Sequence, residues 1–259
     1  MKKVLVTGAN GQLGHCLQKI APDYKDLAFV FKNSKDFDIT NKEQMNSLFA
    51  VDNFDYCINC AAFTNVEQAE KTPEIAFKVN AEGVKNLALI CREYDTSLIH
   101  ISTDYVFDGE KKEPYSIDDI PNPINEYGKS KLLGEKYIQE MTDDYCIIRT
   151  SWLYSEFGKN FYTSILKKAK AGDNLSVTDS QTGCPTNANN LANYILTVLS
   201  SNDKSLGIYH FTDGEILNWF EFAEKILANN NLTKNVKLEK VKNYRTFARR
   251  PKYSVLHIL

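Results

Sequence analysis

Residues 4–14 read VLVTGANGQLG, an apolar run followed by glycines at positions 8, 11 and 14. The run predicts a β-strand, and the glycines lie between it and the start of a predicted helix. Glycine permits positive φ and a close backbone approach, while a helix N-terminus offers free amides and a positive dipole end to an anion. The stretch therefore predicts a turn that binds the pyrophosphate of a dinucleotide, with a tight turn that binds nothing as the alternative.

The first 150 residues alternate strand and helix patterns. Strands are predicted at 3–7, 27–31, 56–60, 98–102 and 146–149, and apolar residues at helical spacing lie between them. Strict alternation implies right-handed crossovers and a parallel sheet covered on both faces. We expect an α/β fold, a doubly wound parallel sheet of the Rossmann type, whose first 150 residues bind NAD(P).

After residue 150 the alternation loosens. Helical patterns at 159–171, 188–199 and 217–228 are separated by short apolar runs at 175–178 and 208–211. We expect residues 151–259 to form mainly a smaller C-terminal lobe that binds the substrate, with a soft boundary that the chain can cross. The cleft between the two units is the default site.

Charge and hydropathy limit the partners. The 31 basic and 33 acidic side chains sum to −2, so no global field favours a nucleic acid as partner. The apolar run after Lys3 breaks at Gly8, far short of a signal sequence or of the roughly 20 residues of a membrane span. We expect a cytoplasmic protein with no membrane partner.

Cysteine and histidine spacing does not indicate a metal. Six cysteines without a secretory signal are expected to be reduced thiols. Cys57 and Cys60 have a metal-ligand spacing, but three residues along a strand point to opposite faces, which favours structural thiols. Histidines 15, 210 and 257 have no ligand-type partners at suitable spacing, so no metal site is predicted.

The residues after the second predicted strand bear on the choice of cofactor. Lys32-Asn33-Ser34-Lys35 stands where an acidic residue would bind the ribose diol, and its charge suits a 2′-phosphate better. Asp38 and Ile39 follow at a distance where they could meet the adenosine end. These residues favour NADPH, or the use of both NADPH and NADH.

Tyr127 and Lys131 lie four residues apart in a predicted helix at 126–140, so they project from one face. A neighbouring ammonium favours the phenolate, and the pair could relay a proton to a carbonyl oxygen that gains charge as hydride reaches its carbon. The alternative is an ordinary exposed helix pair.

The strand predicted at 98–102 supports the relay. It ends in Ser102 and Thr103, which places hydroxyl groups at the carboxyl edge of the sheet, where ligands bind. His100, inside this strand, is interpreted as a core histidine with satisfied hydrogen bonds rather than as a catalyst.

Almost from end to end, the chain resembles the extended short-chain dehydrogenases and, within them, the dTDP-4-dehydrorhamnose reductases. The motifs that carry the resemblance are VTGANGQLG (6–14), NCAAFTNVE (59–67), HISTDYVF (100–107), YGKSK (127–131), RTSW (149–152), GKNF (158–161) and ARRP (248–251). The glycine motif is shared by a large superfamily. TDYVF joined to RTSW is far more specific.

The resemblance implies hydride transfer from NADPH or NADH to C4 of dTDP-4-dehydro-L-rhamnose, a step of dTDP-rhamnose and polysaccharide biosynthesis. Its catalytic residues would be Tyr127 as proton donor, Lys131 on the nicotinamide ribose and Thr103 on the sugar oxygen. Implied cofactor contacts are Gly8, Asn10, Gly11, Gln12, Leu13, Gly14, Asp38, Ile39, Ala61, Ala62, Phe63, Thr64, Tyr127 and Lys131.

The resemblance also implies substrate contacts, at Thr103, Asp104, Tyr105 and Trp152. For Trp152, core packing is an equal alternative. Arg249 and Arg250 could neutralise a diphosphate, or form a solvated basic turn. The expected ligand is a small nucleotide-sugar substrate. The chain itself is expected to be a monomer or a homodimer.

Two other functions fit the same motifs. The Tyr-Lys pair and the glycine turn do not encode the hexose, so a reductase or epimerase of another nucleotide sugar is one alternative. The other is a non-catalytic NAD(P)-binding regulatory subunit, like that of methionine adenosyltransferase. The presence of Thr103, Tyr127 and Lys131 together favours an enzyme.

Overall fold

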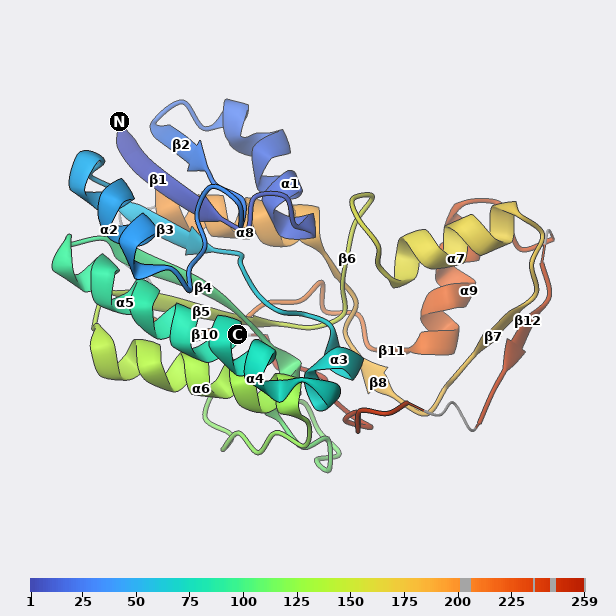
Figure 1. Ribbon diagram of the computed structural model, residues 1–259. Coiled ribbons are helices and arrows are strands. Elements are labelled where there is room, and N and C mark those ends of the chain that lie inside the picture. Colours follow the sequence, from blue (N-terminus) through green and yellow to red (C-terminus); the bar gives the residue numbers. More distant parts are fainter. Residues whose placement is uncertain (201–205, 235, 243–245, 259) are drawn as a thin grey trace.

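A six-stranded parallel sheet forms the centre of the computed structural model, which describes residues 1–200, 206–234, 236–242 and 246–258 (Figure 1). The strand order is β10-β5-β4-β3-β1-β2, and each neighbouring pair is parallel. The strands are β1 (Lys2–Thr7), β2 (Leu27–Phe31), β3 (Tyr56–Asn59), β4 (Ser97–Thr103), β5 (Tyr145–Thr150) and β10 (Gly207–His210). The expected doubly wound α/β fold is confirmed.

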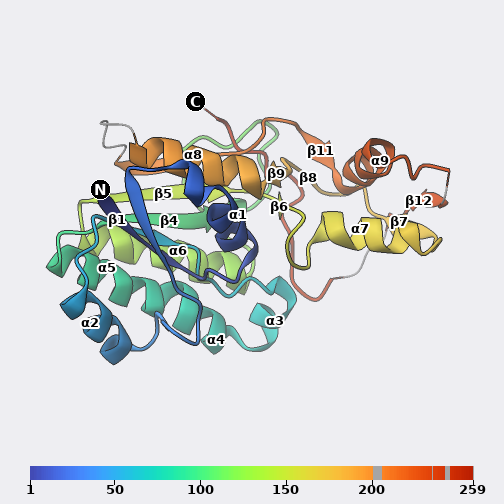
Figure 2. The ribbon, with the colours of Figure 1, turned by 90° about the horizontal axis from the view of Figure 1, so that it is seen from above.

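Helices cover both faces of this sheet (Figure 2). One face packs on α1 (Gln12–Ile20) and α8 (Ala188–Ser200). The opposite face packs on α2 (Lys42–Val51), α5 (Val84–Glu93) and α6 (Glu126–Met141). The strands between them are buried on both sides, as a parallel sheet requires. Within the described residues, no helix has the length and apolar character needed to span a bilayer.

The chain returns to the sheet after residue 150. Helix α8 packs against α1, and β10 extends the sheet beside β5, with Ile208 opposite Ile147. Both elements follow the first part of the C-terminal lobe in sequence. The sheet unit is therefore built from two separate stretches of the chain.

The C-terminal lobe has its own core at one end of the sheet unit (Figure 1). It contains α7 (Phe161–Lys170), α9 (Trp219–Asn229), and the parallel pair β7 (Leu175–Val177) and β12 (Leu238–Lys240). Two short pairs lie between lobe and sheet, namely β6 (Leu153–Tyr154) with β9 (Thr186–Asn187) and β8 (Thr182–Gly183) with β11 (Leu217–Asn218).

Capping residues explain where the lobe helices begin. Asn160 accepts a hydrogen bond from the Thr163 amide at 2.9 Å, so α7 begins at Phe161 rather than at 159. Asn218 and Glu221 form a capping box, and Leu217 pairs with Gly183 instead of continuing the helix. The helix predicted from 217 therefore begins at Trp219.

The helical pattern between β3 and β4 is broken into pieces. It comprises α3 (Val66–Lys71), α4 (Pro73–Phe77), a π-helical segment η2 (Lys78–Gly83) and α5. Two short 3₁₀ turns, η1 (Ala21–Asp23) and η3 (Asp104–Val106), complete the described elements of the sheet unit. The π-helical turn matters because it presents the Asn80 side chain and carbonyl to α6.

Gly134→Ala in α6 is expected to lower the free energy of unfolding by about 1–3 kcal/mol. The added Cβ would lie 2.2 Å from the Asn80 carbonyl oxygen, so the helix would have to move off η2. At an exposed helix position the same change stabilises by about 1 kcal/mol. Urea unfolding of the parent protein and of Gly134→Ala measures whether the free energy of unfolding falls or rises.

Lys136→Ala is the matched control, because Lys136 is exposed on the same helix. Its unfolding free energy should change by less than about 0.5 kcal/mol. A Gly134→Ala variant as stable as the parent would show that α6 does not rest on η2.

Candidate active site

The glycine turn after β1 forms a cradle at the carboxyl edge of the sheet. Gly8 has φ of +63°, and a Cβ there would lie 2.6 Å from the Ala61 nitrogen. A Cβ on Gly14 would lie 2.5 Å from the Ala9 carbonyl oxygen. Side chains are thus excluded at both positions, because the turn packs tightly on the backbone of Ala61 and Ala9.

The start of α1 is left open for an anion. Gly11 is the N-cap, no side chain caps the helix, and its first turn carries no acidic residue. The orphan amides and the positive dipole end therefore face outward without a protein partner of their own. A dinucleotide pyrophosphate fits this cradle.

The other predicted cofactor contacts near the carboxyl edge of the sheet differ in their exposure and in their hydrogen-bond partners. Asn10 is exposed, whereas Leu13 is buried in the core, so only its backbone can meet a ligand. Asp38 accepts a hydrogen bond from the Thr40 amide at 2.9 Å, and the buried Ile39 packs against Gly83. Gln12 reaches across to the lobe, where its Oε1 accepts from Asn160 Nδ2 at 2.5 Å.

The loop after β3 is fixed by a residue that sequence analysis missed. Asn80 is fully buried; its Oδ1 accepts from the Phe63 amide at 2.8 Å, and its Nδ2 donates to the Phe63 carbonyl at 2.9 Å. The same Nδ2 donates to Ser130 Oγ at 3.0 Å. Asn80 thus joins the stretch containing Ala61, Ala62, Phe63 and Thr64 to the helix of Tyr127 and Lys131. Nothing in local spacing marks this role.

The first turn of helix α6 packs against the segment at the end of β4. Asn125 caps it by accepting from the Gly128 amide at 2.7 Å. A Cβ on Gly128 would lie 2.1 Å from the Tyr105 carbonyl oxygen, so the helix and η3 touch backbone to backbone. The Tyr127 and Tyr105 rings meet edge-on, with centroids 5.9 Å apart. The expected meeting of the Tyr127 helix with the Thr103 edge is present.

The state of the Tyr127 phenol differs from the sequence-based expectation. Burial raises the pKa of Tyr127 above its usual value, and the nearby Asp104 raises it further, while a hydrogen bond with Thr103 opposes both. The expectation that the Lys131 ammonium favours the phenolate is wrong here, because Lys131 is not among the groups that shift this pKa. Tyr127 remains a protonated phenol at neutral pH.

Lys131 is 2% exposed and turned toward the sheet. Its Nζ donates to the Ile101 carbonyl at 2.7 Å and lies 3.1 Å from His100 Nε2. Burial lowers the pKa of Lys131 to about 8, partly offset by Glu135 and Cys60. His100 is fully buried with both ring nitrogens partnered, as the sequence predicted for a core histidine.

A buried ion pair secures α6 one turn further on. Arg149 Nη2 lies 2.7 Å from Glu135 Oε2, and Ser102 Oγ donates to Glu135 Oε1 at 2.5 Å. Sequence analysis missed this pair. Its only signal is that Glu135 follows Lys131 by four residues on the same helix face. The pair joins α6 to both β4 and β5.

The residues expected to contact the substrate gather beside Thr103. Asp104 is 2% exposed, and burial raises the pKa of its carboxyl group to about 7. Tyr105 accepts a hydrogen bond from Arg250 Nη1 at 3.4 Å, and Arg250 Nη2 pairs with Glu67 at 2.8 Å. Arg250 therefore has protein partners, whereas Arg249 is exposed.

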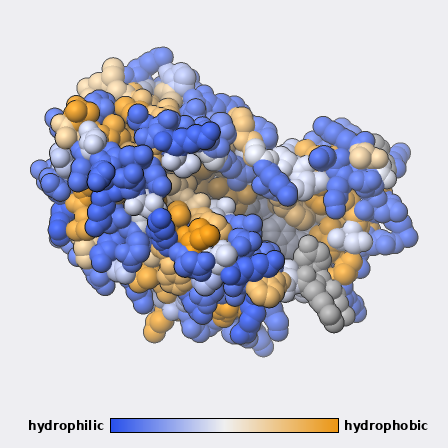
Figure 3. All heavy atoms as spheres, in the orientation of Figure 1, coloured by the Kyte–Doolittle hydropathy of each residue, from blue (hydrophilic) through white to orange (hydrophobic). Residues whose placement is uncertain are grey.

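Trp152 lies between the sheet and the lobe. Its φ is +47°, and its ring stacks on that of Trp219 with centroids 3.6 Å apart and planes at 5°. Gly183 permits this position, because a Cβ there would lie 2.6 Å from the indole. Trp152 is partly buried and packs against the core of the lobe, so both of its expected roles, core packing and a substrate contact, stay open. The surface is hollowed between the two units (Figure 3).

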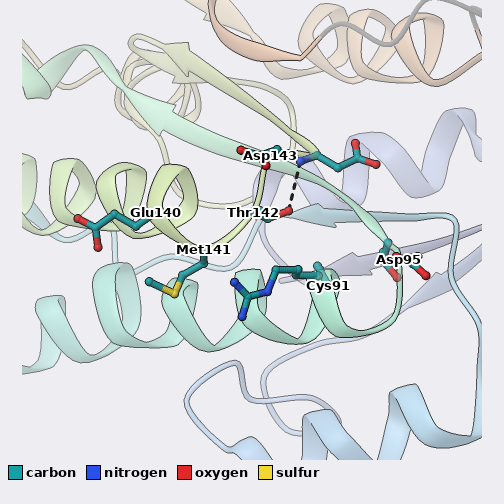
Figure 4. A pocket seen from close by; sticks show the side chains of 9 residues that line it. Cys91, Asp95, Glu140, Met141, Thr142 and Asp143 are labelled. Atoms are coloured by element: carbon teal, nitrogen blue, oxygen red, sulfur yellow. Dashed lines mark hydrogen bonds between the residues drawn. The ribbon is translucent and has the colours of Figure 1, made fainter.

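A cavity of about 510 Å³ lies elsewhere, where α5 and α6 end and β4 and β5 begin (Figure 4). Its lining includes Cys91, Asp95, Glu140 and Met141. This is the amino end of the strands, opposite the edge where parallel sheets bind ligands. In the described part of the chain, no three metal-ligating side chains cluster here or elsewhere.

Known proteins share this architecture over nearly the whole chain. The family model for the RmlD substrate binding domain matches residues 1–258. A dTDP-4-dehydrorhamnose reductase of Aggregatibacter actinomycetemcomitans is 37% identical, over 100% of this chain and 91% of the relative. The spore coat polysaccharide biosynthesis protein SpsK of Bacillus subtilis is 38% identical, with 99% and 89% covered.

Among solved structures, a Bacillus anthracis dTDP-4-dehydrorhamnose reductase in complex with NADP gives a TM-score of 0.94 at 37% identity. That match covers 100% of this chain and 92% of the other. These matches confirm the resemblance first inferred from the motifs, and the chain belongs to the family of the RmlD substrate binding domain.

Proposed function

We propose that this chain reduces the C4 keto group of dTDP-4-dehydro-L-rhamnose with NADPH or NADH, giving dTDP-L-rhamnose. The observation that carries the proposal is the meeting of a protonated Tyr127 with Thr103 at the sheet edge that also holds the glycine cradle. Family membership and the names of the full-length relatives support the substrate.

Tyr127 is the proposed proton donor. A phenol whose pKa is raised by burial keeps its proton at neutral pH and can give it to an oxygen that becomes strongly basic. The reduced nicotinamide supplies the hydride when bound. Thr103 lies close enough to Tyr127 to affect its pKa and would also hold the sugar oxygen, so that the proton donor and its acceptor would start close together.

Cofactor binding is proposed at the glycine cradle and the loops beside it. Gly8 and Gly14 allow the tight turn, Gly11 puts no side chain at the start of α1, and the free amides there would hydrogen-bond the pyrophosphate. Lys131, one helical turn after Tyr127, would donate to the nicotinamide ribose. In the described part of the chain, no carboxylate pairs with Lys32 or Lys35, which supports a 2′-phosphate contact after β2.

Substrate binding is proposed across the cleft. Asp104 and Tyr105 offer polar groups to the sugar beside Thr103, and Trp152 forms an apolar wall opposite them. Residues 1–150 would then bind mainly the cofactor and residues 151–259 mainly the substrate. We further propose that the protein is a cytoplasmic monomer or homodimer. The net charge of −2 supports the absence of a nucleic-acid partner.

Purified protein is expected to consume NADPH when given dTDP-4-dehydro-L-rhamnose, measured as loss of nicotinamide absorbance. A panel of dTDP- and UDP-linked keto sugars tests the alternative substrates. Faster turnover of another sugar would replace the proposed substrate. Tight cofactor binding without turnover of any sugar would instead favour a non-catalytic subunit.

Tyr127→Phe should reduce kcat by about 100- to 10,000-fold, because the ring stays in place while the donated proton is lost. Cofactor fluorescence should still report binding. Tyr137→Phe is the matched control, since Tyr137 lies on the same helix and its hydroxyl meets Glu82 at the surface. Turnover undiminished by Tyr127→Phe would rule out this residue as the donor.

NADPH is expected to have the lower KM, and Lys32→Ala should raise the KM for NADPH more than that for NADH. The reason is that only NADPH carries the 2′-phosphate that the ammonium would neutralise. Lys25→Ala, exposed at the opposite end of β2, serves as the control. Equal effects on both cofactors would contradict the proposed contact.

A further inference from the structure

One glutamine side chain crosses from the glycine cradle to the C-terminal lobe. Gln12 is the first residue of α1, so its backbone amide is among those that have no partner within the helix. Its side chain reaches the segment at 153–160. Nε2 donates to the Leu153 carbonyl at 3.1 Å, and Oε1 accepts from Asn160 Nδ2 at 2.5 Å. The same residue therefore belongs to the proposed pyrophosphate site and contacts the lobe.

Backbone carbonyls fix the orientation of both side-chain amides. A carbonyl oxygen can only accept, so the Gln12 atom that faces Leu153 must be the NH₂ group, and its oxygen faces Asn160. Asn160 Nδ2 lies 3.0 Å from the Ser155 carbonyl and 3.1 Å from the Phe157 carbonyl, so this atom is also an NH₂ group. In this orientation the two amides meet as donor and acceptor.

The two partners of Gln12 lie where the lobe side of the cleft begins. Leu153 directly follows Trp152, a proposed substrate contact, and starts β6, which pairs with β9 through Thr186. Asn160 is the N-cap of α7, and α7 contributes to the core of the lobe. A displacement of the Gln12 side chain would therefore affect both the aromatic residue and the lobe helix.

Two other contacts join α1 to the same segment, further from the carboxyl edge of the sheet. The rings of His15 and Phe157 have centroids 5.4 Å apart, and Lys19 Nζ lies 2.7 Å from Glu156 Oε1. His15 and Lys19 follow Gln12 by about one and two helical turns. Both members of the ion pair are exposed, and such pairs contribute little to stability. Of these three contacts, that of Gln12 is nearest to the proposed ligands.

Given the proposed reductase function, we propose that Gln12 is a positioning residue that sets the distance between the nicotinamide and the sugar. Its amide would hold the pyrophosphate while its side chain holds Leu153 and Asn160, so both ligands would be positioned from the same residue. Hydride transfer needs the reacting atoms about 3–3.5 Å apart, and a misplacement of about 1 Å can lower the rate about 100-fold. Loss of the side chain should therefore slow hydride transfer without weakening cofactor binding.

Gln12→Met is the first variant, because methionine keeps the length of the side chain and removes both hydrogen bonds. In single turnovers with saturating NADPH and dTDP-4-dehydro-L-rhamnose, hydride transfer should be slower by about 10- to 100-fold. A primary isotope effect with NADPH deuterated at C4 identifies the observed step. The Kd for NADPH, from nicotinamide fluorescence, should stay within about twofold of the parent value. A purely structural role would lower the amplitude of the turnover and leave its rate unchanged.

Asn160→Ser tests the same contact from the lobe side, away from the cradle. Serine still caps α7 but lacks the amide that reaches Gln12. This variant should also slow hydride transfer and leave the Kd for NADPH unchanged. Asn218→Ser is the matched control, because Asn218 caps the other lobe helix, α9, by accepting from the Glu221 amide. Lys19→Ala is the control on α1, and both controls should turn over at the parent rate.

Hydrogen exchange of the ligand-free protein tests the link without turnover. Amides at 153–160 should exchange faster in Gln12→Met than in the parent, and at the parent rate in Lys19→Ala. Unchanged exchange in Gln12→Met would overturn the proposed link.

Hydride transfer at the parent rate in Gln12→Met or in Asn160→Ser would overturn the positioning role. A Kd for NADPH that rises along with the loss of rate would also overturn it, because the side chain would then be a cofactor contact. If the parent protein reduces no sugar, the proposed function fails, while hydrogen exchange still decides whether Gln12 holds the lobe.

Discussion

Backbone contact between α6 and its two supports holds the candidate site together. Gly128 lets the first turn of the helix touch the Tyr105 carbonyl, and Gly134 lets its third turn touch that of Asn80. Just before the first contact the helix presents Tyr127 toward Thr103, and between the two contacts it presents Lys131 toward the sheet. A helix displaced by the width of one methyl group would lift both side chains from the edge of β4.

The core beneath the candidate site contains several buried charged side chains. Lys131, Glu135 and Arg149 are each at most 2% exposed and lie among other buried polar side chains. Buried charges carry a large desolvation cost unless they are paired and hydrogen-bonded. Here Glu135 pairs with Arg149, whereas Lys131 has only neutral partners within hydrogen-bond distance. The low pKa of Lys131 is the physical result of that difference.

The two units are joined by specific contacts on the side of the cleft. Gln12, at the start of α1, accepts a hydrogen bond from Asn160 at the start of α7, which links the glycine cradle to the lobe. Trp152 enters the lobe by stacking on Trp219. Because α8 and β10 return from the lobe to the sheet, the chain crosses between the units more than once (Figure 2).

The sequence by itself determined the parallel sheet, the glycine cradle and the pairing of Tyr127 with Lys131 on one helix face, because these depend on local periodicity. The tertiary structure decided what those residues become. Burial, which no local pattern encodes, keeps Tyr127 protonated and weakens the hold of Lys131 on its proton. Asn80 and His100 act through partners that are distant in the sequence, so only the packing of η2, β4 and α6 reveals them.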